Sequence, residues 1–335
     1  MLYRALRPLL FRLDPERAHA LTLGLLSAAR RLNLHHLYGT HAGSRPVQLM
    51  GLTFPNRVGL AAGLDKNAAC VDALGALGFG FVEVGTVTPR PQAGNPRPRI
   101  FRIPRAEALV NAMGFPNEGV EAACARLRKR SFAGVCGVNI GKNATTPLSD
   151  AAADYTHCLR AVYPLADYVA INISSPNTPG LRQLQAEEYL SPLLESLLDT
   201  RERLAAQLGR RVPLLVKLSP DLTDTDLEAL AAVVRALGID GVIATNTTVQ
   251  RPGLGDLPDA ARPGGLSGRP LHALATGVVR RLRALLPEGL PIVGVGGISS
   301  LDSAREMLEA GADLIQIYTG LIYRGPRLVR VLSRL

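Results

Sequence analysis

Eight short apolar runs, most of them followed by a helical pattern, recur along the chain after residue 57. They lie at residues 58–62, 79–87, 133–140, 168–175, 214–219, 241–247, 292–298 and 314–320. Eight repeats of strand and helix predict an α/β protein whose parallel strands close into a (β/α)8 TIM barrel. An open doubly wound sheet is the alternative. Such a sheet needs a glycine fingerprint after its first strand, however, and the segment AAGLDK does not match GxGxxG.

The N-terminal segment follows a different pattern. Between residues 2 and 13, leucines at helical spacing are interleaved with arginines, which predicts a short basic amphipathic helix. Asp14 and Pro15 supply the N-cap and the first position of a second helix, whose apolar face ends at Arg30 and Arg31. We therefore expect a small helical extension at residues 1–43 and a barrel domain at residues 44–335. The two apolar stripes suit either docking at a membrane interface or packing on the barrel.

Composition and charge limit the class of protein. The 335 residues are 47% hydrophobic and 20% charged, which suits a folded protein with a large core. No apolar run approaches about 18 residues and no signal-peptide cleavage pattern is present, so we expect the chain to remain in the cytoplasm. The formal charge of +10 is spread along the chain and by itself identifies neither nucleic acid nor an anionic membrane as a partner.

Cysteine and lysine are used sparingly. The four cysteines show no CxxC spacing and fall within apolar or helical patterns, so we expect buried thiols, with neither disulfides nor a metal site. Only four of the 38 basic residues are lysines, and these are Lys66, Lys129, Lys142 and Lys217. In a chain that otherwise uses arginine, a lysine indicates a position that needs a compact ammonium group whose pKa can be tuned.

The segment INISSPNTPGLR at residues 171–182 begins as an apolar strand and breaks into a polar loop. Pro176 and Pro179 fix the backbone, so the loop should hold Ser175, Asn177 and Thr178 above the strand end. We interpret it as a candidate active-site loop, and residues 176–186 could close as a lid. A Ser-Ser-Pro turn that only caps a strand is the alternative.

All eight predicted strands end in small, polar or glycine residues, which packing alone does not explain in a closed parallel barrel. These residues are Ala62, Gly63, Thr86, Asn139, Asn172, Ser175, Lys217, Thr245, Asn246, Gly296, Gly297, Tyr318 and Thr319. We expect them to line a pocket. The sequences GVGGIS and IYTG, after the seventh and eighth strands, offer backbone amides where barrels commonly bind a phosphate group.

Carboxamides dominate the predicted rim, and they occur at Asn111, Asn139, Asn172, Asn177 and Asn246. A carboxamide matches the alternating N–H and C=O edge of an imide or pyrimidine ring, so we expect a polar, ring-shaped amide as substrate. Turn formation is the alternative explanation for each asparagine. Because no histidine lies at a strand end, the available proton acceptors are the lysines and Ser175, and serine is a useful base only in a dry site.

Two segments, 88–119 and 248–270, are too long and too rich in proline and glycine to be simple connections. The first contains RIFRI and EALVN, which predict a small hairpin above the barrel. Both segments should lie on the loop face, where barrel enzymes place their sites.

The chain resembles the dihydroorotate dehydrogenases, FMN-containing (β/α)8 barrels of pyrimidine synthesis, over nearly its whole length. The motifs that carry the resemblance are GLAAGLDK, EVGTVTPRPQ, NIGKN, INISSPNTPGLR, VIATNTT, GGLSGRP, GVGGI and QIYTG. A serine in the position of the base and a helical N-terminal extension make it similar to the membrane-associated, quinone-reducing class 2. The soluble class, which uses fumarate or NAD, is the less similar subtype.

The resemblance implies a flavoenzyme that oxidises dihydroorotate to orotate, with one FMN per chain and a membrane quinone as second substrate. It also implies a monomer, bound peripherally to the anionic cytoplasmic face of the inner membrane and not to nucleic acid. Ser175, hydrogen-bonded through Thr178 and flanked by Phe115, would remove the proton at C5 while hydride leaves C6 for flavin N5. Lys66 would attract the substrate carboxylate, and Lys217 would support negative charge on the reduced flavin.

The resemblance further implies three sets of binding residues. The substrate set is Lys66, Asn111, Ala112, Met113, Gly114, Phe115, Asn172, Asn177, Asn246 and Thr247. The FMN set is Ala62, Gly63, Leu64, Asp65, Lys66, Thr86, Asn139, Asn172, Lys217, Thr245, Gly268, Gly297, Tyr318 and Thr319. The quinone-entrance set is His19, Arg102 and Tyr318.

One loop departs from the family pattern. Residues 111–117 read NAMGFPN, with Ala112 and Pro116 in place of an arginine and an asparagine, whereas Asn111 and Phe115 are retained.

Two other functions remain open from the residues alone. One is a barrel lyase or isomerase that forms a Schiff base through Lys66 or Lys217. The other is a basic membrane or nucleic-acid adaptor, although such an adaptor would favour arginines over amides at the rim.

Overall fold

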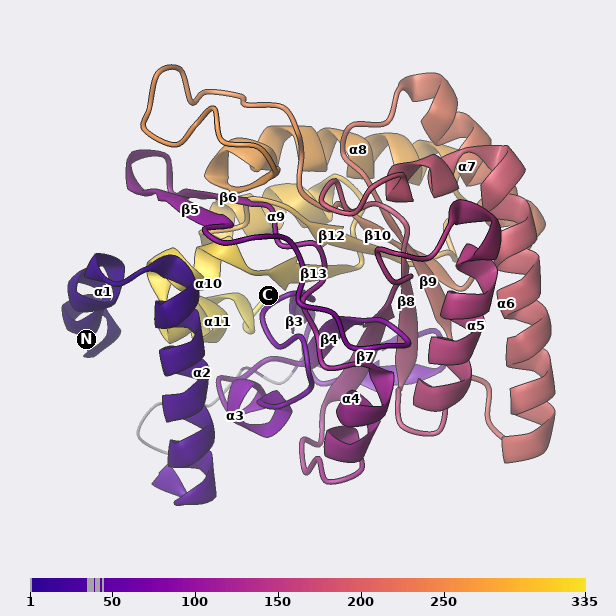
Figure 1. Ribbon diagram of the computed structural model, residues 1–335, viewed down its shortest axis with the longest axis horizontal. Helices are drawn as coiled ribbons and strands as arrows, with labels where there is room; N and C mark the ends of the chain where they lie inside the picture. Colours follow the sequence, from indigo (N-terminus) through magenta and orange to yellow (C-terminus); the bar gives the residue numbers. More distant parts are fainter. Residues whose placement is uncertain (1, 35–38, 40–42, 44) are drawn as a thin grey trace.

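Eight parallel strands form a closed barrel in the computed structural model, which describes residues 2–34, 39, 43 and 45–335 (Figure 1). The order around the barrel is β10-β12-β13-β3-β4-β7-β8-β9. The strands are β3 Val58–Leu60, β4 Phe81–Val87, β7 Val135–Ile140, β8 Tyr168–Asn172, β9 Leu214–Leu218, β10 Gly241–Ala244, β12 Ile292–Val295 and β13 Leu314–Ile317. The predicted (β/α)8 fold is confirmed. Each predicted run contains one of these strands, and residues at the C-terminal end of most runs belong to the loops of the rim.

Helices surround the strands on the outside of the barrel. They are α3 Val71–Gly75, α4 Val120–Leu127, α5 Ala151–Val162, α6 Glu187–Leu208, α7 Asp224–Ala236, α8 His272–Leu285, α9 Leu301–Glu309, α10 Thr319–Arg324 and α11 Pro326–Leu332. Helix α7 begins with a capping box, in which the Thr223 hydroxyl accepts from Asp226 N and the Asp226 carboxylate accepts from Thr223 N. The main hydrophobic core lies between these helices and the strands.

A hairpin that the sequence patterns did not predict closes the N-terminal end of the barrel. Strands β1 (Val47–Leu49) and β2 (Leu52–Phe54) are joined by Met50 and Gly51, both at positive φ, as a tight hairpin turn requires. The Phe54 ring is fully buried and packs edge-to-face on Phe81, with 5.3 Å between the ring centroids. Because Phe81 begins strand β4, this contact lies at the end of the barrel opposite the rim loops.

The two long connecting segments, 88–119 and 248–270, meet in a separate three-stranded sheet. Strands β5 (Ile100–Ile103) and β6 (Ala108–Asn111) form the predicted hairpin, and β11 (Gly265–Gly268) pairs antiparallel with β6. The third strand was not predicted, because the sequence GGLSG carries none of the β-branched residues that mark a strand. This small sheet has its own hydrophobic cluster, which includes Val110 and Leu266.

The N-terminal segment forms the two predicted helices, α1 (Leu2–Arg12) and α2 (Pro15–Arg31), which stand against one side of the barrel (Figure 1). The Asp14 carboxylate caps α2 by accepting from the backbone N atoms of Glu16 and Arg17, at 3.0 and 2.9 Å. The predicted boundary between residues 43 and 44 adjoins a stretch that lies partly outside the described residues. None of the helices in the described part of the chain has the length and hydropathy to cross a bilayer.

Candidate active site at the rim of the barrel

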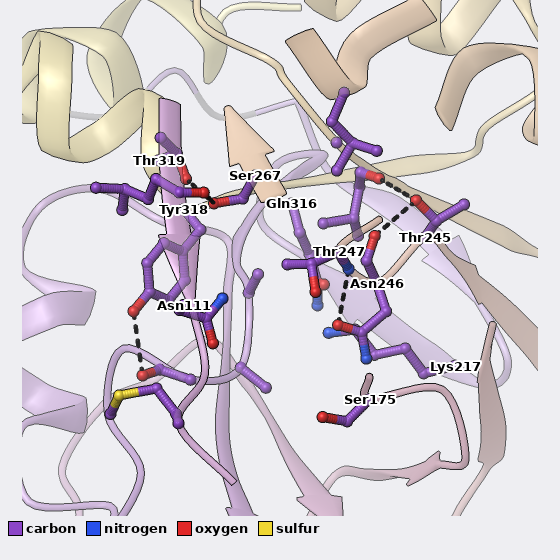
Figure 2. Close-up of a pocket in the computed structure, with 18 of the residues that line it drawn as sticks. Asn111, Ser175, Lys217, Thr245, Asn246, Thr247, Ser267, Gln316, Tyr318 and Thr319 are labelled. Carbon is purple, nitrogen blue, oxygen red and sulfur yellow. Dashed lines mark hydrogen bonds between the residues drawn. The ribbon is translucent and has the colours of Figure 1, made fainter. Parts of the chain in front are cut away.

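A cavity opens at the C-terminal ends of the barrel strands, with about 1160 Å³ of space that is partly continuous with solvent. Asn111 and Tyr318 lie on one side of it, and Ser175 and Lys217 lie on the other (Figure 2). Most of the predicted site residues line this one cavity. They are Ala62, Gly63, Lys66, Thr86, Asn111, Met113, Gly114, Phe115, Asn172, Ser175, Asn177, Lys217, Thr245, Asn246, Thr247, Gly268, Gly297, Tyr318 and Thr319. Segments that are distant in sequence therefore converge on one space.

Three residues of the predicted FMN set lie behind the lining. Leu64 is buried in the main hydrophobic core. Asp65 is buried, and its carboxylate accepts from the backbone N atoms of Ala69 and Cys70 at 2.9 and 2.7 Å. Asn139 is fully buried one layer below the cavity. In these positions Asp65 supports the turn that carries Lys66, and Asn139 supports the cavity floor.

The floor of the cavity is a connected polar network. Asn172 donates from Nδ2 to Thr86 Oγ1 at 2.9 Å and to Asn139 Oδ1 at 3.1 Å. Asn246 in turn donates from Nδ2 to Asn172 Oδ1 at 3.2 Å and to Ser174 Oγ at 3.0 Å. Because each amide is fixed by its neighbours, the face of the network toward the cavity has a set pattern of donors and acceptors.

A carboxylate that the sequence analysis missed lies at the centre of this floor. Glu83 is fully buried and accepts from Asn139 Nδ2 at 2.8 Å, Tyr168 OH at 2.9 Å and Gln316 Nε2 at 2.7 Å. Lys217 Nζ lies 3.3 Å from Glu83 Oε1. Burial and the Glu83 charge raise the pKa of Tyr168, so its phenol stays protonated. A charged residue inside the apolar strand FVEV was the signal that could have identified Glu83.

Gln316 is a second residue that sequence analysis missed, and it lines the cavity from β13. Its Oε1 atom is buried and has no hydrogen-bond partner within the described chain. A buried acceptor without a partner costs free energy, which favours a ligand donor at this point. Ser267 also lines the cavity, and its Oγ lies 2.8 Å from Thr319 Oγ1.

Ser175 follows strand β8 and is 5% exposed. Its Oγ accepts from Asn177 N at 3.3 Å, which is the geometry of a serine turn. No direct hydrogen bond joins Thr178 to Ser175 within the described residues. Thr178 Oγ1 is buried with no hydrogen-bond partner among the described residues. The donor to the Ser175 hydroxyl is therefore a backbone N–H of the turn between the two prolines, and not the Thr178 hydroxyl.

The second half of the same loop is fixed in place. Residues Leu181–Gln185 form a 3-10 helix in which Leu181 and Leu184 are buried. Arg182, which the sequence analysis did not single out, donates to Thr247 O at 2.9 Å and pairs with Asp221 at 2.8 Å. Any movement of the loop as a lid would therefore be confined to its first half, next to Ser175.

Lys66 lines the cavity, and its Nζ donates to Gly63 O at 2.6 Å. Burial lowers the pKa of the Lys66 ammonium group to about 8, although Glu16 and Asp65 act in the opposite direction. Burial and the nearby Lys66 charge lower the pKa of His19 to about 3, so this histidine is neutral at physiological pH. Of the other lysines, Lys142 is buried and donates to Thr146 O at 2.8 Å, which is a structural contact.

The loop at residues 111–117, which departs from the family pattern, is fixed by hydrogen bonds to its backbone. Gln92 Nε2 donates to Gly114 O at 3.0 Å and to Phe115 O at 3.1 Å. Gly114 and Phe115 both have positive φ, which turns the Phe115 ring toward the cavity that it lines. Ala112, in contrast, contributes backbone bonds: its N donates to Arg99 O and its O accepts from Asn95 Nδ2.

Of the three described residues expected at a quinone entrance, only Tyr318 lines this cavity. Burial raises the pKa of Tyr318 to about 12, and its OH donates to Gly63 O at 3.3 Å. Arg102 instead binds the end of helix α1. It donates to Leu13 O at 2.8 Å and lies 4.8 Å from the centroid of the Phe11 ring. The four cysteines are free and buried, as predicted.

Comparisons with known proteins agree with this geometry. Residues 45–334 match the family model of dihydroorotate dehydrogenase. The dihydroorotate dehydrogenase (quinone) of Xanthomonas oryzae pv. oryzae is 56% identical over 329 residues, which cover 98% of this chain and 94% of that protein. The protein of the same name from Chromobacterium violaceum is 55% identical over 334 residues, covering 100% of this chain and 97% of that protein.

The solved structures point to the same family. The crystal structure of DHODH from Eimeria tenella in complex with ferulenol is similar with a TM-score of 0.89 at 38% identity, covering 96% of this chain and 90% of that chain. The ligand-free form from the same organism gives 0.88 at 39% identity, covering 96% of this chain and 93% of that chain. The similarity thus extends over the barrel, the rim loops and the N-terminal helices, and the chain belongs to the dihydroorotate dehydrogenase family.

Proposed function

We propose that this protein is an FMN-dependent dihydroorotate dehydrogenase that oxidises (S)-dihydroorotate to orotate in pyrimidine biosynthesis and passes the electrons to a membrane quinone. The names of its relatives support the reaction and the acceptor. The observation that carries the proposal is that one cavity is lined by buried Ser175, buried Lys217 and the carboxamides of Asn111, Asn172 and Asn246. Family membership favours this redox reaction over Schiff-base chemistry at Lys66 and over an adaptor role.

The chemistry of the cavity fits a flavin mononucleotide. Gly63, Gly268, Gly296 and Gly297 line it at positive φ, so this part of the wall is backbone without side chains and can approach a flat ring or a phosphate closely. The unpartnered Gln316 Oε1 can accept from a ring N–H. Bound FMN would supply the hydride acceptor and the route for electrons to the quinone. Lys217 would hold its ammonium group beside the ring and stabilise negative charge there.

The remaining side chains would bind and orient the substrate. The Lys66 ammonium would pair with its carboxylate, and the amides of Asn111, Asn177 and Asn246 would bind the imide edge of its ring. Asn246 is held by Asn172 and Ser174, and Asn177 is held by Asn111, so these amides are already oriented. Such preorganisation lowers the entropic cost of reaching the reactive geometry.

Ser175 would accept the proton from C5 of the substrate. A serine hydroxyl is a weak base, so negative charge that develops on Oγ must be stabilised. The backbone N–H of Asn177 already points at Ser175 Oγ and would provide that stabilisation without the Thr178 hydroxyl. Phe115 would shield the reacting atoms from water, which strengthens this interaction.

The N-terminal helices would dock on the membrane. Their outward faces carry a group of exposed leucines, namely Leu6, Leu9, Leu13, Leu21 and Leu25, with Leu32 and Leu34 just beyond. Such an apolar face with arginines beside it suits the interface of an anionic bilayer. We propose peripheral binding at the cytoplasmic face of the inner membrane by a monomer. His19, Arg102 and Tyr318 would border the path of the quinone to the flavin.

An anaerobic titration tests the proposal. Purified protein should carry FMN, lose its flavin absorbance at one equivalent of dihydroorotate and recover it when a short-chain quinone is added. Protein that contains or accepts FMN but is not reduced by dihydroorotate would contradict the proposed reaction. Borohydride reduction with candidate sugar phosphates, followed by mass spectrometry, is the matched test for a Schiff base at Lys66 or Lys217.

A further inference from the structure

A buried arginine connects helix α2 to the segment in front of strand β5. Arg99 is 5% exposed, and its Nη2 lies 2.7 Å from Glu16 Oε1 in the first turn of α2. Its Nη1 donates to Ala93 O at 2.6 Å and to Asn95 O at 2.8 Å. Arg99 thus uses one side of its guanidinium for α2 and the other for residues 93–95, a geometry that a lysine cannot reproduce.

Asn95 connects this segment to two loops of the active site. Its Nδ2 donates to Ala112 O and to Asn177 O, both at 3.0 Å, and its backbone N donates to Met113 O at 3.0 Å. A Cβ on Gly114 would lie 2.7 Å from Asn95 Oδ1, so the contact is tight. Asn95 is not among the described residues that line the cavity, and it nevertheless joins the loop at 111–117 to the loop that carries Ser175.

Asn177 completes the connection. Its Nδ2 donates to Asn111 Oδ1 at 3.0 Å, and its backbone N donates to Ser175 Oγ at 3.3 Å. Hydrogen bonds therefore run without a break from Glu16, through Arg99, Asn95 and Asn177, to Ser175. These hydrogen bonds are partly buried, so breaking one of them leaves a partner that water can replace only in part.

We propose that Asn95 and Arg99 are positioning residues that set the geometry of Asn177 and Ser175 and make it depend on the seating of helix α2. The inference rests on the proposed function, which assigns the substrate to this part of the cavity. Because Glu16 belongs to α2, displacement of α2 from the barrel would remove the ion pair with Arg99 and loosen the substrate side of the site. Helix α2 also carries the exposed Leu21 and Leu25. The oxidation of dihydroorotate is then coupled to the placement of the N-terminal helices.

Variants of the full-length flavin-loaded protein test this coupling. Asn95→Ala interrupts the series of hydrogen bonds at its centre, and Glu16→Gln weakens the series at α2. Arg97→Gln is the matched control, because Arg97 pairs with the same Glu16 carboxylate but is 71% exposed and lies outside the series. Three quantities are measured: the Kd of orotate from the flavin spectrum, the rate of flavin reduction by dihydroorotate, and the rate of flavin reoxidation by a short-chain quinone.

Asn95→Ala should weaken orotate binding by about ten- to a hundredfold and slow flavin reduction, because Ala112 O and Asn177 O lose their donor. The rate of flavin reoxidation by the short-chain quinone should stay within about twofold of the wild-type rate, since the hydrogen bonds of Asn95 orient the substrate and take no part in electron transfer to the quinone. Glu16→Gln should change orotate binding in the same direction but less, and Arg97→Gln should leave it unchanged. The double variant of Glu16 and Asn95 should bind orotate no worse than Asn95→Ala alone.

Wild-type orotate binding in Asn95→Ala, or losses that simply add in the double variant, would overturn the inference. An equal loss in both half-reactions would also overturn it, because that result indicates general damage. If Asn95→Ala does not fold, Glu16→Gln decides, and unchanged orotate binding in that variant overturns the coupling. Wild-type protein that dihydroorotate fails to reduce would overturn the proposed function itself, whereas normal wild-type reduction with unaffected variants would overturn only this inference.

Discussion

The carboxylate of Glu83 lies 3.3 Å from the ammonium group of Lys217, and both side chains are buried, with Lys217 lining the cavity and Glu83 behind it. Each charge offsets the desolvation cost of the other, and donors from Asn139, Tyr168 and Gln316 satisfy the remaining lone pairs of the carboxylate. This pair gives the Lys217 ammonium group a counter-charge at the floor of the cavity.

Glu83→Gln should therefore destabilise the protein, because it leaves the Lys217 charge buried without a counter-charge. We expect the free energy of unfolding to fall by about 3–5 kcal/mol. The double variant Glu83→Gln with Lys217→Met should recover part of that loss, since no buried charge remains. Chemical denaturation of the three proteins measures both values. Equal destabilisation of the single and double variants would show that the pair is not what stabilises the floor.

Orotate binding should weaken as the pH rises through about 8. Burial lowers the pKa of Lys66 to about 8, so the ammonium group is present below that pH and lost above it. The substrate carboxylate needs the charged form, and affinity must fall in the same direction. Spectroscopic titration at a series of pH values measures the effect. Lys66→Met should bind weakly at every pH, and a wild-type affinity that stays constant across this range would refute the assignment.

Replacing exposed leucines of the N-terminal helices should reduce vesicle binding without changing the chemistry. Leu9 and Leu25 are 57% and 60% exposed, so Leu9→Ser with Leu25→Ser removes apolar contact with lipid without opening the core. We expect weaker co-sedimentation with anionic vesicles and slower turnover with a long-chain quinone, but normal flavin reduction by dihydroorotate. Leu208→Ser is the matched control, because Leu208 is 47% exposed at the end of α6, across the barrel from α1 and α2 (Figure 1). Equal vesicle binding by all variants would exclude this docking face.

Phe54→Ala should lower the free energy of unfolding by about 3–5 kcal/mol, because it leaves a cavity in a closed interior. The ring is fully buried against Phe81 at the end of the barrel away from the site. FMN content and the Kd of orotate should therefore be unchanged in the folded fraction. Thermal and chemical unfolding, with flavin stoichiometry as the second measurement, check the two statements. Loss of flavin at unchanged stability would place the hairpin in the site instead of at the base.

The barrel could be predicted from the sequence because parallel strands that are covered on both faces appear as apolar runs. The start of helix α7 is marked in the same way by Thr223, whose hydroxyl can cap a helix N-terminus. Short elements escaped prediction. The hairpin around Met50 has strands of three residues, and β11 is a glycine-rich segment whose partner, β6, is more than a hundred residues earlier in the chain. Its pairing depends on tertiary contact, which no local pattern records.

The candidate site was predictable as a set of residues more than as a set of contacts. Strand ends gather at one rim by topology, so Asn172 and Lys217 could be placed together from their position alone. Hydrogen-bond partners depend on side-chain direction, which the sequence does not give: Thr178 Oγ1, expected to bond toward Ser175, has no direct partner within the described residues. The network through Asn95 joins four separate segments, and no spacing within one segment predicts it.

The rate of flavin reduction in Ser175→Ala tests the central claim most directly. Anaerobic stopped-flow mixing with dihydroorotate should give a rate constant lower by about 100- to 10,000-fold, because the proton acceptor has been removed. Orotate should still bind, since its other contacts remain, and this control separates chemistry from binding. Flavin reduction near the wild-type rate in this variant would contradict the account and assign the proton to another group.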